Sequence, residues 1–460
     1  MGNGLAYAVL AIWPLIAIKL YKTKSIQEAS LWTIIGGFMC LAVKTEVDFP
    51  MIPAIGKHSM PVVSALMGCM LIKKKRISYL KGQGGIKYLV ILFIVMPFIT
   101  ATFNGDAIIV GGRFIRSFNY YDGLSATINQ FLIIMPFFMG RQFFKTYDDH
   151  LLMFRFLVIA GLIYTVPMLY EIRMSPQLHT IFYGYFPHSF AQQVRGGEFR
   201  PVVFMGHGLL VGFFTFIVLL SVVSLWEIKI KIRQFLPSRV SYYVLIVLVL
   251  CKAKAALLYG VLAFFMIKKT AHKTQMRIAV LMVITALSYP SLSIIKVFPH
   301  ESIIQLATDV MGEERAESLK FRFDNENVLL SHARERLFFG WGGWGRNRVY
   351  SKVTGRDITV TDGRWIITFG QFGLFGFMAE FGLMAITVFR ANKAVRLVKR
   401  KSEQTLLAAH ALLVGIVMID QLPNASLAPW LWLLIGILLG RSETIIAKNK
   451  VKQVSNLSTQ

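Results

Sequence analysis

Long apolar segments recur along the whole chain, and they constrain the fold more than any other feature of the sequence. A helix that crosses a membrane needs about twenty mostly apolar residues, and helices satisfy their own backbone groups where lipid offers no hydrogen bonds. We therefore predict an all-α polytopic membrane protein with about twelve to thirteen transmembrane helices. The predicted spans are 4–20, 29–43, 59–72, 86–102, 124–140, 151–170, 202–226, 240–251, 253–267, 276–296, 366–389, 404–420 and 425–440.

The composition supports one membrane domain over residues 1–460. Of the 460 residues, 55% are hydrophobic and 16% are charged, against about 25% charged in a soluble domain. The mean hydropathy is +0.56. The first apolar run starts at Leu5 without preceding basic residues, so we expect a spanning helix there and not a cleaved signal peptide. Cys40, Cys69 and Cys251 lie in apolar runs, and we expect neither a disulfide nor a cysteine metal site.

The net charge of +26 has a membrane explanation. Basic residues gather in short loops between apolar runs, which is the positive-inside pattern and does not indicate nucleic-acid binding. These loops are Lys19–Lys24, Lys73–Arg76, Lys229–Arg233, Lys268–Lys273 and Lys393–Lys401, and the tail adds Lys448 and Lys450. If all are cytoplasmic, the N-terminus is outside and the C-terminus inside. The runs 240–251 and 253–267 must then form a hairpin and not one long tilted helix.

Three longer loops fall on the outer side, at about 103–123, 171–201 and 297–365. They mix charged, aromatic and glycine residues, as expected of a site carried on a rigid scaffold. The loop 297–365 is the longest, and its segment 313–335 predicts an amphipathic helix near the membrane surface. We expect the residues that perform the chemistry to lie in these loops.

Glycines are closely spaced at the end of this long loop and in the span that follows. Gly370, Gly373 and Gly376 would share one helix face and permit close packing against a neighbouring helix. The segment Gly340–Gly345 is not a phosphate loop, since no Gly-Lys-Ser/Thr follows it. It predicts a tight turn, whose backbone amides are also suited to an anion.

Ionisable residues near the outer ends of the apolar runs are further candidates. Arg200 lies at the outer boundary of a predicted span, and His207 would lie about two turns deeper in it. Ionisable groups inside spans are functional candidates, although a helix-packing histidine and a snorkelling arginine are the simpler interpretations. Lys252 and Lys254 would stand outside at the hairpin tip, where they suit either an anionic ligand or a snorkelling anchor.

Three of these stretches occur in a particular order. The stretch from Arg200-Pro to His207-Gly comes first, Lys254-Ala-Ala-Leu-Leu-Tyr-Gly260 second, and the long loop third. That loop carries Arg322 and Gly340-Trp-Gly-Gly-Trp-Gly before a glycine-spaced span with Glu380-Phe-Gly. In order and spacing, residues 190 to 390 resemble the O-antigen ligase and O-antigen polymerase superfamily. The first half is similar in hydropathy alone.

This resemblance implies a GT-C-like glycosyltransferase in the bacterial inner membrane, with its active site facing the periplasm. The donor would be a glycan on undecaprenyl diphosphate, and the acceptor a glycan or a lipid-linked molecule. No cofactor, metal ion or nucleotide sugar would be needed. Such a protein would be an O-antigen or exopolysaccharide polymerase or ligase, surrounded by membrane lipid, and a chain-length regulator stays open as a further partner. Where the family carries a His-Asn-type pair as the candidate base, this chain has Asp362-Gly363.

The chemistry of such a transfer indicates which residue types to assign. Arginines and lysines would hold the diphosphate, a base would deprotonate the acceptor hydroxyl, and aromatic rings would carry the sugars. The candidates for the diphosphate are Arg200, Lys254, Arg346, Arg348 and Arg364. The first candidate for the base is Asp362, followed by His332, Glu326 and Asp324. The substrate-binding candidates are His207, Trp341, Trp344 and Trp365, with Tyr350 as a further ring, although the tryptophans could instead form an interfacial aromatic belt.

Two further expectations concern mechanism and rival functions. A direct, inverting displacement is expected, because no second close carboxylate is evident for a covalent intermediate. The main rival is a transporter of lipid-linked oligosaccharide or polysaccharide, although the chain lacks the paired halves common in transporters. A membrane acyltransferase that uses His207 and a structural subunit of an export machine are the remaining rivals.

Overall fold

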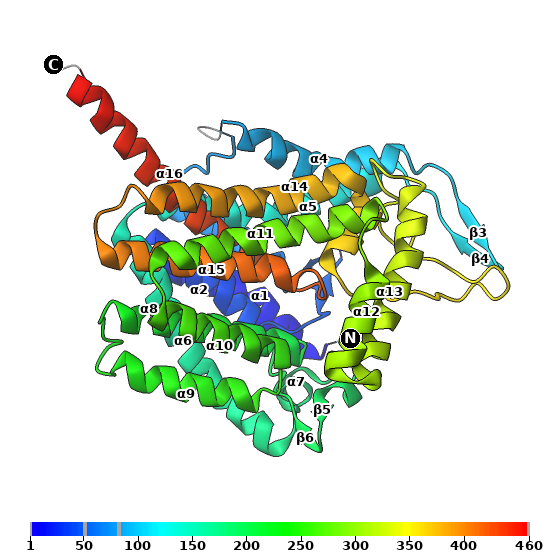
Figure 1. Cartoon of the computed structure of the whole chain (residues 1–460), viewed down its shortest axis with the longest axis horizontal. Coiled ribbons are helices and arrows are strands. Elements are labelled where there is room, and N and C mark those ends of the chain that lie inside the picture. Colours follow the sequence, from blue (N-terminus) through cyan, green and yellow to red (C-terminus); the bar gives the residue numbers. More distant parts are fainter. Residues whose placement is uncertain (1, 49–52, 81–83, 458–460) are drawn as a thin grey trace.

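The structure, a computed structural model of the 460-residue chain, describes residues 2–48, 53–80 and 84–457. Most of the described residues lie in helices that run back and forth as one bundle (Figure 1). These helices are α1 (Gly4–Thr23), α2 (Ile26–Cys40), α3 (Met60–Met67) with its π-helical continuation η1 (Gly68–Ile72), α4 (Ile86–Thr102), α5 (Tyr120–Phe143), α6 (Tyr147–Met174), α8 (Gly208–Glu227), α9 (Pro237–Leu250), α10 (Lys254–Lys269), α11 (His272–Ile294), α14 (Arg364–Val395), α15 (Lys401–Asp420) and α16 (Pro429–Leu457).

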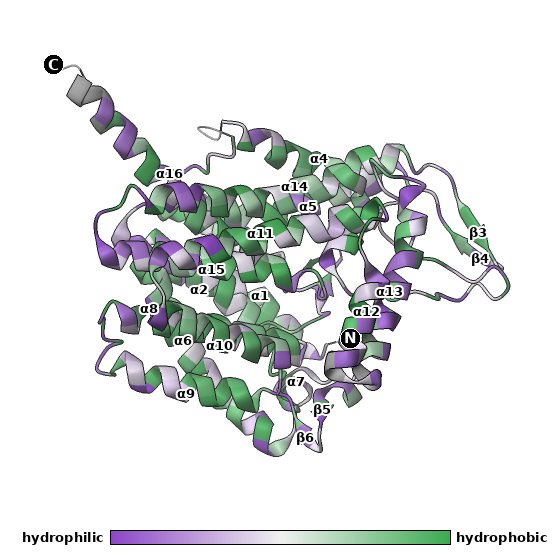
Figure 2. Ribbon diagram, viewed as in Figure 1, coloured by the Kyte–Doolittle hydropathy of each residue, from purple (hydrophilic) through white to green (hydrophobic). Residues whose placement is uncertain are grey.

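Every predicted apolar run forms a helix. Within the described part of the chain, eight helices are long and apolar enough to cross a membrane, and 60–72, 86–102 and 237–250 form shorter apolar helices. Figure 2 shows the hydrophobic colour along the bundle and the hydrophilic colour mainly at its ends and on the C-terminal tail. The polytopic helical class is therefore confirmed. The predicted hairpin is confirmed as well, because α9 and α10 are joined only by residues 251–253, with Lys252 in a left-handed conformation (φ 53°).

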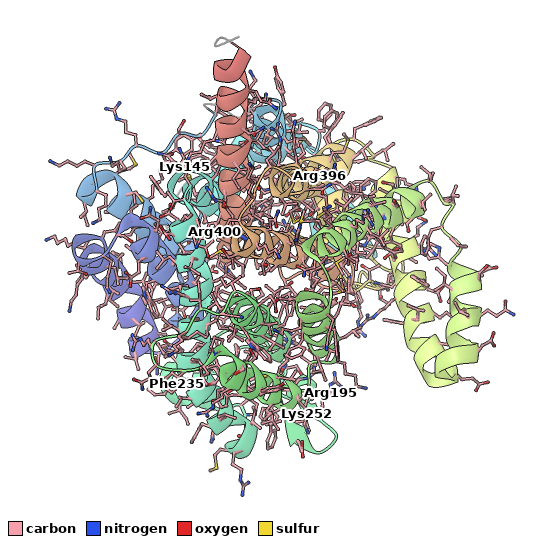
Figure 3. The ribbon with its side chains drawn as sticks, turned by 60° about the vertical axis from the view of Figure 1, so that its left-hand side comes forward. Lys145, Arg195, Phe235, Lys252, Arg396 and Arg400 are labelled. Atoms are coloured by element: carbon pink, nitrogen blue, oxygen red, sulfur yellow. The ribbon has the colours of Figure 1, made fainter. Side chains whose placement is uncertain are left out.

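The two ends of the bundle differ as the charge pattern predicts. The predicted basic loops lie at the end that carries the C-terminus, where Figure 3 shows Lys145, Arg396 and Arg400 close to the base of α16. The N-terminus and the three longer loops lie at the opposite end, which we call the loop end (Figure 1). The two termini therefore lie at opposite ends of the bundle, as the predicted topology requires.

The loop end carries its own small elements. The helices there are α7 (Leu178–Tyr183), η2 (Ala191–Gln193), α12 (His300–Met311) and α13 (Glu313–Arg334), and α12 and α13 stand across the end of the bundle (Figure 1). The antiparallel strand pairs are β1 (Glu46–Val47) with β2 (Ile55–Gly56), β3 (Ile108–Val110) with β4 (Arg113–Ile115), and β5 (Val194–Arg195) with β6 (Glu198–Phe199). The helix predicted over 313–335 forms as α13, but its polar and apolar residues are not separated onto two faces, so the predicted amphipathic character is not borne out.

Small residues let α5 and α16 pack closely. A Cβ atom added to Gly436 would lie 2.1 Å from the carbonyl oxygen of Phe137, and one added to Gly440 would lie 2.2 Å from that of Arg141. From the other side, a Cβ on Gly140 would lie 2.4 Å from the carbonyl oxygen of Leu433. Glycines four residues apart permit backbones to approach in this way inside membranes. The contact anchors the last helix in the bundle.

Two predicted spans differ from the structure. The first, 202–226, is helical only from Gly208, because residues 201–207 form an irregular loop. His207 is the N-cap of α8 and not a residue two turns inside it, and its Nδ1 accepts a hydrogen bond from the N–H of Leu209 at 3.0 Å. An imidazole at a helix start satisfies one of the free amide groups there. The local sequence Gly206-His207-Gly208, with φ +93° at Gly206, explains why the helix starts late.

The second difference is a sharp reversal inside α14. Gly373 has φ 65° and ψ −164°, so the helix divides into 364–372 and 374–395. Sixteen residues of a straight helix would separate Arg364 from Glu380 by about 24 Å. The Arg364 Nη2 atom instead lies 2.8 Å from Glu380 Oε1, and the Thr368 hydroxyl donates to the same carboxylate. Segment 364–372 therefore folds back along 374–395, and we call it the re-entrant helix.

The long loop satisfies the backbone groups that this reversal leaves open. The N–H groups of Trp341 and Gly342 donate to the carbonyl oxygens of Gly370 and Gln371 at 2.8 and 2.9 Å, and Leu374 N–H donates to Leu337 at 2.8 Å. A Cβ on Gly373 would lie 2.3 Å from the Phe338 backbone. The prediction that the three glycines share one helix face is therefore wrong. Gly373 is the reversal itself, and the long loop occupies the space beside it.

Candidate active site

A cavity of about 190 Å³ lies at the loop end, and we call it the carboxyl pocket. It is bounded by the end of α11, the middle of α13, the start of the re-entrant helix and the turn after α15. Its polar lining residues are Tyr289, Arg322, Asn325, Glu326 and Asp362. It therefore brings together two of the predicted acid–base candidates, Glu326 and Asp362, from positions far apart in the loop.

Glu326 has the environment of a general base. Burial raises its carboxyl pKa to about 7, although the hydroxyl of Tyr289, which donates to Glu326 Oε1 at 2.6 Å, opposes that shift. A base works best when its pKa lies near the pH of the reaction. Asp362, by contrast, is an exposed carboxylate on the same cavity. Partial burial and the hydrogen bond from Tyr289 favour Glu326 as the candidate base over Asp362, which was the first candidate from sequence.

The re-entrant helix sets the depth of this pocket. Its first N–H, that of Arg364, donates to the carbonyl oxygens of Gln421 and Asn424 at 2.9 Å each. Glu380, the partner of Arg364, lies six residues beyond Leu374, or about 9 Å below the outer end of that helix. Irregular backbone at such depth is tolerated where it lines a cavity. Asp362 and Gly363 therefore stand inside the outer part of the bundle and not above it.

A second group of polar residues, the cationic cluster, surrounds the start of α8. It consists of His188, Arg195, Arg200, His207 and Lys252. The rings of His188 and His207 are 4.7 Å apart, and Arg200 donates from Nε and Nη2 to the backbone carbonyl of Lys252 at 3.1 and 2.9 Å. Burial, with help from His188, Arg200 and Arg195, lowers the pKa of His207 to about 4. The imidazole is therefore neutral and suited to hydrogen bonding.

Positive charge in this cluster is only partly compensated. Lys252 pairs with Glu198 of the β5–β6 hairpin, and Figure 3 shows Arg195 and Lys252 near each other at that hairpin. Among the described residues, no carboxylate forms an ion pair with Arg195 or Arg200. Lys254 begins α10 immediately after the hairpin turn and is exposed. The arrangement is suited to binding an anion, and the assignment of Arg200, Lys254 and His207 to a substrate stays a prediction.

Buried polar side chains hold the loop that presents Arg200 and His207. Glu171 Oε2 accepts from the N–H groups of Val202 and Val203, each at 2.7 Å, and Tyr164 accepts from Phe204 N–H at 3.1 Å. Lys57 donates to the carbonyl of Phe204 at 2.5 Å. Val203 has φ +46°, a conformation that a β-branched residue rarely adopts. Strain of this kind persists only where several contacts enforce it, which is often at functional loops.

Three predicted site residues are instead engaged in holding the long loop. Arg346 is fully buried and donates to backbone oxygens of Asp106 and Arg116 at 2.8 and 3.1 Å. His332 lies 2.9 Å from the carbonyl of Arg346, and Arg348 pairs with Asp357 at 2.7 Å. None of the three lines the carboxyl pocket. The structure gives no support to Arg346 and Arg348 as diphosphate ligands or to His332 as a base.

Arg364 is also already paired with a protein carboxylate. Its guanidinium forms two contacts with the buried carboxylate of Glu380, at 3.0 Å from Nε and 2.8 Å from Nη2. A cation neutralised in this way offers little charge to a diphosphate. We therefore assign Arg364 to the reversal of α14 and not to the substrate.

Two of the three predicted tryptophan platforms, Trp341 and Trp365, have no open ring face. Trp341 is stacked by His332 at 4.2 Å between ring centroids and by the Arg336 guanidinium at 4.1 Å. Trp344 is stacked by Phe118 at 5.2 Å and by the Arg116 guanidinium at 4.0 Å. Trp365 is completely buried against Tyr289. Stacking of sugars on Trp341 and Trp365 is incompatible with this packing. Trp344 is 57% exposed and borders a cavity beside α5, so its role as a sugar platform stays a prediction.

Several residues of both sites were not candidates from sequence. Tyr289 lies in an apolar run, and only its position five residues before the end of α11 hints at a role. His188 and Arg195 stand in the second outer loop, where their distance from other motifs gave no signal. Arg322 belonged to the family-like pattern without a role, and the structure places it on the carboxyl pocket.

No protein-family model matches the sequence, and no curated protein is significantly similar to it. The chain's own geometry therefore carries any functional conclusion.

Proposed function

We propose that this protein is a bacterial inner-membrane glycosyltransferase that transfers or polymerises a glycan carried on undecaprenyl diphosphate, in the manner of O-antigen polymerases and ligases. The observation that carries this proposal is the carboxyl pocket, in which the half-buried carboxylate of Glu326, with a pKa of about 7, faces a cavity at the loop end of the bundle. A cavity at the end of a membrane bundle suits a lipid-linked substrate, because the sugar next to the diphosphate lies close to the membrane surface.

The cationic cluster supplies what the leaving group requires. Negative charge grows on the diphosphate as the glycosidic bond breaks, and preorganised arginines stabilise that charge. Arg200 and Arg195 lie together without carboxylate partners among the described residues, and the neutral His207 adds a hydrogen-bonding group. Arg200 and Lys254 stay as diphosphate ligands in this proposal, and Arg195 joins them.

Glu326 takes the role of general base for the acceptor hydroxyl. With its pKa of about 7, a substantial fraction is ionised at neutral pH and able to accept a proton. The Tyr289 hydroxyl steadies the charged form through its hydrogen bond. Asp362 stands on the same cavity as a second carboxylate, so the premise behind a direct, inverting displacement is weaker than the sequence suggested. Inversion stays a prediction for product analysis.

Complementation of a gene deletion tests the proposal. Plasmid copies carry Arg200→Ala or Glu326→Gln, with Arg348→Ala and Glu301→Gln as charge-matched controls outside both sites, and membrane abundance is checked by immunoblot. We expect both site variants to accumulate unpolymerised or unligated glycan on the lipid carrier while the controls behave as wild type. An unchanged polysaccharide profile for Glu326→Gln would reject the proposal. Accumulation of the glycan on the cytoplasmic face would indicate a transporter instead.

A further inference from the structure

One face of α5 lines two adjoining cavities that the carboxyl pocket does not include. Asp122, Ser125, Ala126, Asn129, Leu132 and Ile133 recur at helical spacing along this face. The cavities have volumes of about 370 and 280 Å³ and share Glu46, Ala54 and Asn129 in their lining. From Asp122 to Ile133 the face extends about 16 Å along the helix. We call these joined cavities the α5 groove.

The chemistry of the α5 groove differs from that of the cationic cluster. Among the described residues, no lysine or arginine lines either cavity. Its polar groups are a carboxylate at Glu46, the amide of Asn129 and the hydroxyls of Ser59, Thr100 and Ser125. Such a lining repels a diphosphate and offers hydrogen-bond acceptors and donors to hydroxyl groups.

The net charge of the groove is small, which argues against a cation as its ligand. The Asp122 carboxylate pairs with Arg116 at 2.9 Å and accepts from the N–H of Asn119 at 3.0 Å, so its charge is already satisfied. His58 is neutral, because burial lowers its pKa to about 4. Glu46 is then the one carboxylate of the lining without such compensation among the described residues. An uncharged, hydroxyl-rich ligand fits this balance better than an ion.

Asn129 is an exposed polar side chain in the middle of an apolar helix. Asn129 lies nine residues into α5, or about 14 Å from its outer end, and its side chain is exposed to the groove. Polar side chains at such depth in a membrane helix are costly and usually mark a binding site or a water-filled path. The groove gives Asn129 no hydrogen-bonded protein partner among the described residues, so a ligand or water must supply one.

The groove shares chain segments with the surroundings of both parts of the candidate active site. Leu422 and Pro423 line the carboxyl pocket, and Leu427–Pro429, a few residues along the same turn, line the groove. On another side His58 lines the groove, while its neighbour Lys57 holds the loop that presents Arg200. Both sites are therefore built on shared segments, which suits two substrates that meet.

We propose that the α5 groove binds the neutral sugar units of the acceptor glycan, while the cationic cluster holds the diphosphate of the donor. This assignment rests on the proposed glycosyltransferase function and divides the two substrates between two chemically different surfaces. Asn129 and Glu46 select hydroxyl groups, and the apolar end of the groove at Leu132 and Ile133 takes the less polar faces of the sugar rings.

The full-length protein in a detergent without a sugar head group tests the assignment by saturation-transfer NMR. The probe is a neutral oligosaccharide released from the host's own surface polysaccharide, and phosphorus line broadening of inorganic pyrophosphate reports on the cationic cluster. Ser125→Trp fills the groove, and Leu124→Trp is its matched control, because Leu124 is exposed and lines neither cavity. Asn129→Leu removes the hydrogen-bonding group at nearly constant volume, in case the larger residue prevents folding.

We expect Ser125→Trp to abolish saturation transfer to the oligosaccharide and Asn129→Leu to weaken it, while Leu124→Trp and pyrophosphate broadening stay as in wild type. Equal transfer to Ser125→Trp and Leu124→Trp would overturn the groove assignment while leaving the proposed function intact. Oligosaccharide binding that needs the groove, without any pyrophosphate binding, would support the groove and reject the donor site. Loss of both signals in wild type would reject both.

Discussion

The hydrogen bond from Tyr289 to Glu326 gives the sharpest test of the proposed base. Tyr289→Phe removes only the hydroxyl that donates to Glu326 Oε1 at 2.6 Å. A hydrogen bond to a charged group contributes about 1.5–3 kcal/mol, and about 1.4 kcal/mol corresponds to one pH unit. Because the lost bond stabilised the ionised carboxylate, the pKa of Glu326 rises further above about 7.

The higher pKa of Glu326 in Tyr289→Phe should move the pH dependence of activity to higher pH. The base must be ionised to accept a proton, so wild-type activity rises as the pH passes through about 7. In Tyr289→Phe the same rise should occur about one to two pH units higher, which lowers the rate at pH 7 by about 5- to 50-fold. At high pH the variant should recover most of the wild-type rate.

The assay follows consumption of the lipid-linked glycan by solubilised membranes between pH 5.5 and 10. Tyr243→Phe is the matched control, since it removes a hydrogen bond of 2.8 Å to Thr165 that lies away from the pocket. Whatever stability this control loses, its pH profile should keep the wild-type midpoint. A Tyr289→Phe profile that is scaled down without moving would refute the argument that Glu326 is the base.

Two predictions concern stability and are measured by thermal unfolding of the purified protein. Gly373→Ala should destabilise strongly, because its Cβ would lie 2.3 Å from the Phe338 backbone at φ 65°; a melting temperature equal to wild type would contradict the reversal of α14. Arg346→Ala should cost about 3–5 kcal/mol, since it removes a buried cation and leaves several acceptors unpaired. Arg348→Ala should cost less than about 1 kcal/mol, because its ion pair with Asp357 is solvent-exposed.

Local patterns predicted the helices well and the site less well. Apolar length is a property of consecutive residues, so the spans and the α9–α10 hairpin followed from hydropathy and loop charge. The reversal at Gly373 did not, because 366–389 is apolar over almost its whole length and its fold-back depends on Glu380 meeting Arg364 across the turn. Helical periodicity relates residues three or four positions apart, so it cannot predict a contact between Arg364 and Glu380, which are sixteen residues apart.

The sequence assigned more arginines to the diphosphate than the structure supports, because residue type does not show what an arginine contacts. A loop rich in backbone carbonyls needs donors, and a guanidinium supplies five of them, so arginines organise loops as readily as they bind phosphates. Arg346 organises a loop through its contacts to Asp106 and Arg116. In the proposed function, Arg200 binds the phosphate. Only tertiary structure separates them, through the presence of a compensating carboxylate. The same holds for Trp341, whose ring is covered by His332 and by the Arg336 guanidinium of the same loop.

The buried pair of Arg364 and Glu380 links the fold to the proposed chemistry. Taking two charges out of water costs more than packing two apolar residues, so such a pair is a poor choice for stability alone. Its geometry is specific, however: a bidentate contact permits one register between the re-entrant helix and 374–395, whereas apolar surfaces permit sliding. Asp362 precedes Arg364 by two residues, so that register also sets the depth of Asp362 and of the carboxyl pocket. The ion pair thereby gives the pocket a fixed position along 374–395 at some cost in stability, which in the proposed function would align Asp362 and Glu326 with the reacting bond of a lipid-linked glycan.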